Sequence, residues 1–208
     1  MVRVVKVTKN NIDYVAREAG KVIRDGGLVV YPTDTVYGLG ANPFNIEAVN
    51  RVFMAKRRPR NKPLPILVSS IDVVSRIAEV NILARRIMEV FWPGPLTLVL
   101  PAKDIVPCIV TSCTGKIGVR MPKHDIALKI IEYAGGYVIG TSANLSGHSP
   151  PRTAAEAIEQ LGDSVDLVID AGPSPGGIPS TVIEIVGDTI KLVRRGPISL
   201  DEITRHLY

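Results

Sequence analysis

A series of short apolar runs, alternating with amphipathic helical stretches, constrains the fold of this 208-residue chain most strongly. The runs read LVVY, PILV, LTLVL, IGVR, YVIG, LVID, TVIEIV and IKLVRR. Runs of this length, rich in Val and Ile and bounded by Gly, Pro or polar residues, predict strands. Because helical patterns separate most of them, we expect an α/β fold with a twisted sheet of mixed parallel and antiparallel strands and flanking helices.

Apolar residues at helical spacing predict the intervening helices. Asn11 and Asn45 can cap the first two, and Ser199 with Glu202 can form a capping box for the last. TVIEIV and IKLVRR predict a hairpin that turns at the Gly-Asp pair between them. No repeat or long linker divides the sequence, so we expect a single domain over residues 1–208. The predicted helices cover residues 11–24, 45–55, 71–78, 82–91, 126–134 and 153–161.

Composition and charge limit the classes of function. The chain is 46% hydrophobic and 22% charged, which is typical of a globular protein, and its net charge of +5 favours partners that carry phosphate. No run of 18 apolar residues occurs, and the first ten residues lack the apolar core of a signal peptide. We therefore expect a soluble, cytoplasmic protein that does not associate with a membrane.

The cysteines and histidines predict neither a disulfide nor a metal site. Cys108 and Cys113 lie five residues apart without a C-x-x-C pattern, so we interpret them as core or loop residues. The three histidines are scattered without the spacing of metal ligands. No transition-metal site is predicted.

Five cations fall within seven consecutive residues of the stretch AKRRPRNKPL: Lys56, Arg57, Arg58, Arg60 and Lys62. The run begins at the end of a predicted helix, where the helix dipole favours positive charge. Neighbouring like charges repel, so this run is either a solvated face that folding tolerates or a site for an anion.

Two polar loops leave buried strands and are candidates for a ligand site. YPTDTVYGLGAN offers Thr33, Asp34 and Thr35, while GTSANLSG offers backbone amides and the side chains of Thr141, Ser142 and Asn144. Ligands of open α/β sheets bind at such strand ends, although Thr and Asp can equally cap local backbone amides. GTSANLSG has neither the G-x-S-x-G form of a hydrolase nor the form of a P-loop, and GLGANP is not a dinucleotide-binding fingerprint.

Arg120 and Arg194 each stand at the end of an apolar strand. A guanidinium there is costly unless it is paired, and its partner is either a ligand carboxylate or phosphate or an acidic residue of the protein. Ser180 precedes the TVIEIV run, beside a Pro/Gly-rich loop, and is either a simple strand start or a contact for a polar substrate.

Seven segments appear in order between about Tyr31 and Ile198: YPTDTVYGLG, KRRPRNKPL, WPGPLTLVL, VRMPKH, TSANLSG, PSTVIEI and LVRRGPI. Together they resemble the YrdC-like family of threonylcarbamoyl-AMP synthases. The resemblance implies a YrdC-like sheet around a basic cavity. It also implies an enzyme that makes threonylcarbamoyl-adenylate and pyrophosphate from L-threonine, bicarbonate and ATP, for t6A modification of tRNA by a downstream transferase machinery.

The motifs of the family also imply roles for individual residues. The K-x-R motif implies that the catalytic residues are Lys56 and Arg58. Threonine is expected at Thr33, Thr35, Arg120, Thr141 and Ser180. ATP is expected at Arg58, Lys62, Ser142, Asn144 and Arg194. Magnesium is expected on the phosphates of ATP and held mainly by them, so no protein ligands are predicted.

Two alternatives to an active synthase stay open at this point. The basic run and the groove around it suit the phosphate backbone of tRNA or another double-stranded RNA. A relative that binds nucleotide without turnover would carry the same motifs.

Overall fold

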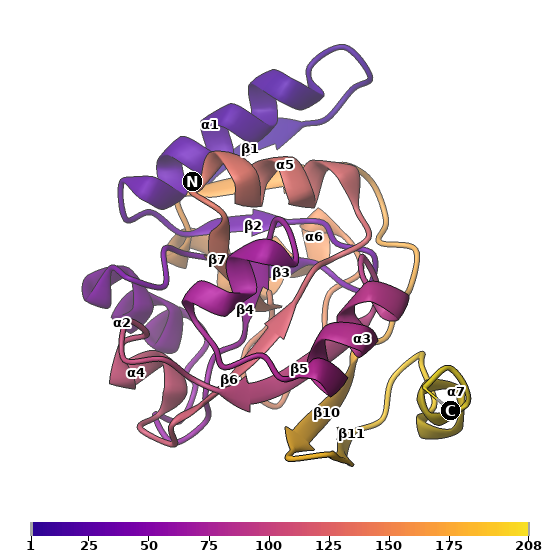
Figure 1. Ribbon diagram of the computed structural model, residues 1–208. Helices are drawn as coiled ribbons and strands as arrows, with labels where there is room; N and C mark the ends of the chain where they lie inside the picture. The colour runs from indigo at the N-terminus through magenta and orange to yellow at the C-terminus, as the bar shows by residue number, and fades with distance from the viewer. Residues whose placement is uncertain (1, 208) are drawn as a thin grey trace.

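The computed structural model describes residues 2–207, which form two β-sheets with helices packed around them (Figure 1). One sheet has the strand order β1-β9-β2-β3-β8 and the other has the order β11-β10-β5-β6-β4-β7. The strands are β1 (Arg3–Lys6), β2 (Val29–Tyr31), β3 (Gly38–Gly40), β4 (Ile66–Val68), β5 (Leu96–Pro101), β6 (Lys116–Arg120), β7 (Tyr137–Ile139), β8 (Thr141–Ser142), β9 (Leu167–Asp170), β10 (Thr181–Val186) and β11 (Thr189–Arg194). The helices are α1 (Ile12–Arg24), α2 (Ile46–Ala55), α3 (Ile82–Phe91), α4 (Cys108–Thr111), α5 (Asp125–Tyr133), α6 (Ala154–Leu161) and α7 (Leu200–Arg205), with 3₁₀ turns η1 (Asp72–Arg76) and η2 (Gly162–Ser164).

The predicted mixture of parallel and antiparallel strands is confirmed, but it is spread over two sheets where we expected one. β9 runs parallel to both β1 and β2, and β5 parallel to β10, whereas β3 is antiparallel to β2 and β6 to β5. The chain crosses between the sheets at Gly140, which separates β7 from β8. A side chain there would overlap Leu67, so only glycine allows this close passage. The apolar run YVIG contains only β7 and Gly140, so the sequence does not show that the next two residues join the other sheet.

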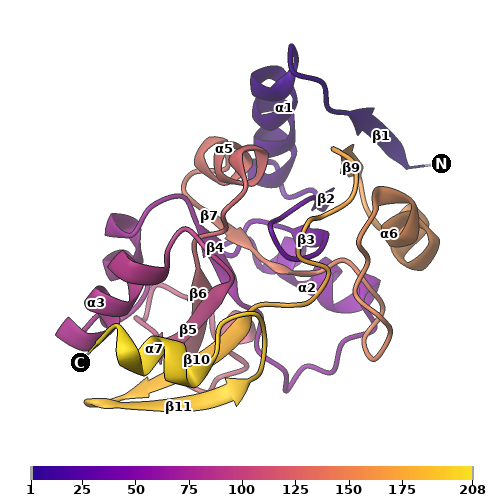
Figure 2. The same ribbon diagram turned by 90° about the vertical axis from the view of Figure 1, so that its right-hand side faces the viewer.

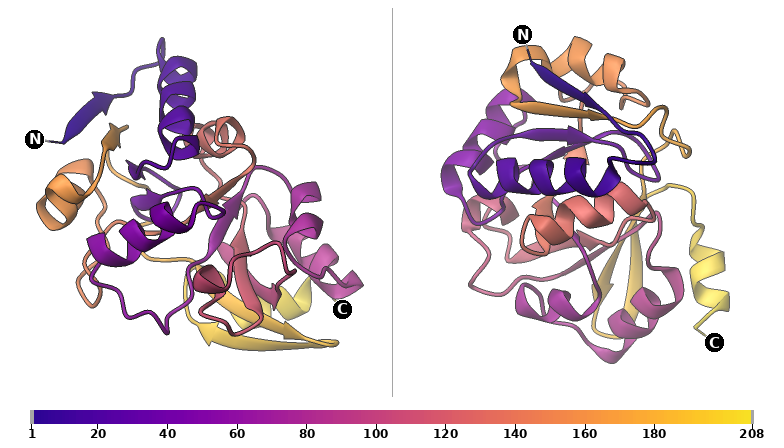
Figure 3. Two further views of the ribbon diagram at one scale, coloured as in Figure 1. Left: turned by 90° about the vertical axis from the view of Figure 1, so that its left-hand side faces the viewer. Right: turned by 90° about the horizontal axis from the view of Figure 1, so that it is seen from above.

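Two apolar clusters hold these layers together. α1 and α5 lie side by side (Figure 3), with α1 packed on β2 and β9 of the five-stranded sheet and α5 packed on β4 and β7 of the six-stranded sheet. Together they form the smaller cluster, which includes Val15, Ile23 and Ile130. The larger cluster takes residues from both sheets, among them Val30 and Leu98. Its continuity agrees with the expectation of one domain, which stays a prediction.

Most predicted elements form close to their expected bounds. The side chains of Asn45 and Ser199 cap α2 and α7 as predicted, but Asn11 does not cap α1, because its side chain accepts from the backbone N–H of Thr8. The predicted β10–β11 hairpin is confirmed and closes one edge of the six-stranded sheet (Figure 2). The stretch 71–78 forms only the short turn η1. None of the helices in residues 2–207 is both long and apolar enough to cross a bilayer.

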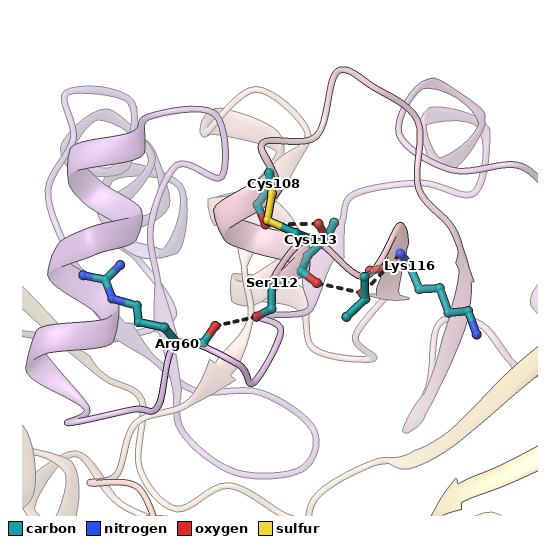
Figure 4. Close-up of a disulfide and its surroundings, with 7 residues drawn as sticks. Arg60, Cys108, Ser112, Cys113 and Lys116 are labelled. Carbon is teal, nitrogen blue, oxygen red and sulfur yellow. Dashed lines mark hydrogen bonds between the residues drawn. A yellow bond between two sulfur atoms is a disulfide. The ribbon is translucent and has the colours of Figure 1, made fainter.

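The prediction that Cys108 and Cys113 do not form a disulfide is wrong. The two residues are joined (Figure 4) at either end of a tight loop that contains α4. Ser112 and Cys113 both adopt positive φ, and this turn brings the cysteine Cα atoms to 4.6 Å. A spacing of five does not predict such a backbone, which is why sequence reasoning missed the bond. Hydrogen bonds tie the loop to the basic run: Ser112 Oγ donates to the carbonyl of Arg60 at 2.8 Å, and the N–H of Leu64 donates to Val110 O at 2.8 Å.

Candidate functional site

A cavity of about 620 Å³ lies between the two sheets. One wall comes from the two polar loops predicted as candidates, through Thr33, Thr35, Thr141 and Ser142. The opposite wall is one face of the six-stranded sheet, and the loop after α2 closes a side with Arg58. The charged residues that line the cavity are Arg58, Lys116, Arg120, Glu184 and Arg194, so the expected basic character is confirmed.

The basic run divides between this cavity and the surface. Arg58 lines the cavity, with its guanidinium held by the carbonyls of Lys62 (3.1 Å) and Pro63 (2.8 Å). Arg57, Arg60 and Lys62 are exposed and do not line it. One arginine of the run therefore faces the cavity while its neighbours face solvent, and the anion site stays a prediction for Arg58.

Lys56 is buried behind the cavity wall, with 1% of its surface exposed. Its ammonium donates to the carbonyls of Ser142 and Asn144, the latter at 2.7 Å, and its own carbonyl accepts from the N–H of Ser146. Burial, with a smaller contribution from the charge of Arg58, lowers the pKa of Lys56 to about 7. The side chain thus fastens the TSANLS loop to the end of α2 and does not itself line the cavity.

Arg120 is fixed at one end of the cavity by three protein partners. Its Nε donates to Gly94 O at 2.9 Å, its Nη1 donates to Thr35 Oγ1 at 3.0 Å, and its Nη2 pairs with Asp34. Burial lowers the pKa of Arg120, and the charge of Asp34 offsets part of that effect. The acidic protein partner considered from the sequence is therefore present, yet the guanidinium still borders the cavity.

Asp34 and Thr33 complete this end of the site. The second carboxylate oxygen of Asp34 is buried and has no hydrogen-bond partner within residues 2–207. Thr33 Oγ1 donates to Val36 O at 2.7 Å and lies 3.0 Å from Thr35 Oγ1, so the TDT loop is held by its own side chains. Hydroxyls and a guanidinium therefore converge on one end of the cavity.

Arg194 is exposed at the cavity mouth beside Ser180. Its Nε and Nη2 donate to Ser180 O at 3.1 and 2.8 Å, and Ser180 Oγ lies 2.8 Å from Thr97 Oγ1. Within the described chain no acidic residue pairs with Arg194 or with Arg58. Burial lowers the pKa of Arg58, and the charge of Arg194 lowers the pKa of both Arg58 and Arg120 further, so Arg194 is close enough to repel each of the other two guanidiniums. Such a group of cations favours a bound anion.

The remaining predicted residues divide in the same way. Thr141 and Ser142 line the cavity, whereas Asn144 is buried behind it and donates to the carbonyls of Leu145 and His148 at 2.8 Å. Sequence reasoning missed Thr97, Lys116 and Glu184, which also line the cavity. Because alternate residues of a strand share a face, Thr97 and Val99, or Val182 and Glu184, would have been found once the inner face of each strand was known.

The described residues offer no ready-made metal site. Within residues 2–207 no group of three or more His, Cys, Asp or Glu side chains is placed to hold a metal ion. Glu184, which lines the cavity, is paired with Lys116, and Asp34, which does not line it, is paired with Arg120. These donors do not fit a magnesium ion held by the protein.

The sequence of this chain is similar to those of known proteins. A model of the Sua5, YciO and YrdC proteins, described as "Telomere recombination", matches residues 21–196. The chain is 40% identical over 210 residues to the threonylcarbamoyl-AMP synthase of Pyrococcus abyssi, covering 99% of this chain and 61% of that protein. It is 34% identical over 167 residues to the threonylcarbamoyl-AMP synthase of Idiomarina loihiensis, covering 79% of this chain and 90% of that protein.

A solved structure is similar over the whole chain. The crystal structure of P. abyssi Sua5 complexed with L-threonine aligns with a TM-score of 0.93 and 38% identity, covering 100% of this chain and 61% of that one. The chain therefore spans about three fifths of the length of the P. abyssi protein.

Proposed function

Because the chain belongs to the family of Sua5, YciO and YrdC proteins, we propose that it is a threonylcarbamoyl-AMP synthase. The proposed substrates are L-threonine, bicarbonate and ATP, and the products are threonylcarbamoyl-adenylate and pyrophosphate. In this proposal the protein acts in the cytoplasm and hands its product to the transferase machinery for t6A in tRNA.

The observation that carries the proposal is the group of three guanidiniums, Arg58, Arg120 and Arg194, around one cavity between strand ends. Arg58 and Arg194 have no acidic partner in the described chain, which leaves both free to bind phosphate oxygens. Arg120 is neutralised in part by Asp34, which suits it to one carboxylate better than to a triphosphate.

We assign threonine to the Arg120 end of the cavity. Its carboxylate would bind Arg120, and its hydroxyl would meet the hydroxyls of Thr33, Thr35, Thr141 and Ser180, all of which line the cavity. A site built from hydrogen-bonding groups rejects analogues that leave those groups unpaired. The enzyme should therefore prefer threonine to amino acids without a side-chain hydroxyl.

We assign the phosphates of ATP to Arg58, Arg194 and the Ser142 loop, with Lys56 and Asn144 supporting that loop from behind. Lys62 would reach a phosphate only from the exposed rim. Threonine and bicarbonate condense to a carbamate and water. A carbamate oxygen then bonds to the α-phosphorus as the bond to the pyrophosphate oxygen breaks. Fixed cations stabilise the charge that develops on the phosphoryl oxygens, and no general base is assigned.

Magnesium enters the proposal only with ATP, on the phosphate oxygens, because the side chains at the cavity do not fit a protein-bound ion. No step assigned to this chain passes through the metal.

The experiment is incubation with ATP, bicarbonate and threonine, followed by mass spectrometry for the adenylate and a pyrophosphate assay. Product should fail to appear when bicarbonate is omitted or when alanine replaces threonine. We expect Arg58→Ala to raise the barrier by about 2 to 4 kcal/mol. Arg57→Ala, from the exposed part of the same run, is the matched control and should keep full activity. Equal rates in the two variants would refute the assignment of Arg58, and ATP binding without any turnover would identify an inactive relative.

Binding of double-stranded RNA or tRNA is a second proposed function, favoured by the exposure of Arg57, Arg60 and Lys62. A filter-binding titration at increasing salt should show affinity that falls steeply if these cations grip the phosphate backbone. Affinity that is unchanged in Arg60→Ala and Lys62→Ala variants would contradict this proposal.

A further inference from the structure

Among the described residues that line the cavity, Glu184 is the only acid. Its side chain is 14% exposed, and the other charged lining residues are Arg58, Lys116, Arg120 and Arg194. A cavity built for anions loses affinity for them when it contains a carboxylate, because like charges repel. Glu184 must therefore either have a structural role only or face a part of the ligand that carries no negative charge.

The sheet register places Glu184 away from the proposed threonine site. Val99 of β5 pairs with Gly118 of β6 on one side and with Glu184 of β10 on the other. Glu184 lies four residues after Ser180, about 13 Å along an extended chain at 3.3 Å per residue. This distance is longer than a threonine molecule, so threonine bound at Ser180 would not reach Glu184. In the proposed site, Glu184 therefore faces the nucleoside part of ATP, on the far side of the phosphates.

One oxygen of Glu184 is occupied and the other is available. The ammonium of Lys116, across β5, pairs with Oε1. The second oxygen accepts no hydrogen bond from any other described residue. An ionised carboxylate only accepts hydrogen bonds, so the ligand group that faces it must be a donor.

The cavity wall beside Glu184 includes apolar residues. Val99 and Val182 line the cavity there, and Gly118 contributes no side chain. An added Cβ at Gly118 would make ordinary van der Waals contacts of 3.4 Å with side-chain atoms of Pro65 and Thr97, and a larger side chain there would take up space in the cavity. A nucleoside combines a flat apolar ring with donors at its edge and on its sugar, which matches an apolar wall with a carboxylate beside it.

We propose that Glu184 is a specificity-determining residue for the nucleotide, and that its carboxylate accepts a hydrogen bond from the nucleoside while Lys116 holds the carboxylate in place. The inference rests on the proposed function and deepens it. The donor is either a hydroxyl of the ribose or the exocyclic amino group of adenine.

The test compares wild type with Glu184→Gln and Glu184→Leu, using ATP, 2′-deoxy-ATP, 3′-deoxy-ATP and inosine triphosphate. Binding of each nucleotide is measured by calorimetry, and pyrophosphate release gives kcat/KM for ATP and for threonine. We expect Glu184→Leu to lose about tenfold or more in ATP affinity, the scale for a hydrogen bond to a charged group, with the KM for threonine unchanged. The loss should disappear for the one analogue that lacks the donor, which distinguishes ribose from base.

Glu184→Gln keeps the shape of the side chain and should show a smaller loss with the same dependence on the analogue. Lys116→Met is the matched control for the ion pair, because it removes the partner but leaves the acceptor. A loss in Glu184→Leu that is equal for all four nucleotides, or no loss at all, would overturn the proposal. Calorimetry does not depend on turnover, so analogue-dependent binding in a protein that makes no threonylcarbamoyl-adenylate would overturn the proposed function and leave this inference standing.

Discussion

Lys56 gives the sharpest test of the electrostatics around the cavity. Burial, with the charge of Arg58, lowers the pKa of Lys56 from 10.5 to about 7. In the unfolded chain the lysine has its ordinary pKa, so between pH 7 and 10.5 the unfolded state binds more protons than the folded state. The free energy of unfolding should therefore rise with pH in this window, and below about pH 7 this lysine should add no further dependence on pH.

The size of the effect follows from the two pKa values. The full window from 10.5 to 7 corresponds to about 5 kcal/mol, of which about 2 kcal/mol falls between pH 7 and pH 9. Lys56→Met keeps a long apolar side chain and removes the titrating group, so all other groups cancel when the two proteins are compared.

The assay is urea denaturation of wild type and Lys56→Met between about pH 6.5 and 9.5. The free energy of unfolding of wild type, minus that of the variant, should increase by about 2 kcal/mol from pH 7 to pH 9. A difference that does not change with pH would refute the reasoning. It would mean that the carbonyls of Ser142 and Asn144 stabilise the ammonium as much as burial destabilises it.

Three further changes test the packing around the site. Asp34→Ala leaves the Arg120 guanidinium buried without its carboxylate and should lower the free energy of unfolding by about 3 to 5 kcal/mol in urea; an unchanged value would show that the pair contributes nothing. Replacing Cys108 and Cys113 by Ser opens a short loop and should cost about 2 kcal/mol without reductant, and wild type should lose the same amount in dithiothreitol; indifference to reductant would contradict the disulfide. Gly140→Ala places a Cβ against Leu67 and should cost about 1 to 3 kcal/mol, seen as a lower Tm; an unaltered Tm would mean that Leu67 moves aside freely.

The strands and helices were predictable where periodicity is strong. The apolar runs form β2, β4, β5, β6, β7, β9 and β10. A strand buried on both faces reads as a continuous apolar run, and a strand buried on one face alternates apolar and polar residues, so both patterns can be recognised in the sequence. β3 and β8 were missed, because Gly38–Gly40 and Thr141–Ser142 are too short for any periodicity to show. β1 was missed because it is an edge strand, and three of its four residues are exposed.

The site was predictable as a set of loops but not as a geometry. Thr35 follows β2, and Arg120 and Ser142 are the last residues of β6 and β8, so a ligand site at strand ends could be predicted from the sequence. The direction of each cation could not. Lys56 and Arg58 are two residues apart, yet Arg57 between them adopts a φ of 48°, and this turn sends one cation behind the wall and the other into the cavity. Tertiary contacts fix such a turn, and no local pattern encodes it.

The space between the two sheets is interior volume that the chain encloses but does not fill. A molecule bound there would contact the TDT and TSA loops on one side and β5, β6 and β10 on the other, and would therefore link the two sheets. A ligand at a free concentration of 100 times its dissociation constant adds about 2.7 kcal/mol to the free energy of unfolding. If the cavity binds its ligands as proposed, the resistance of this protein to heat depends on its ligand supply as well as on its sequence.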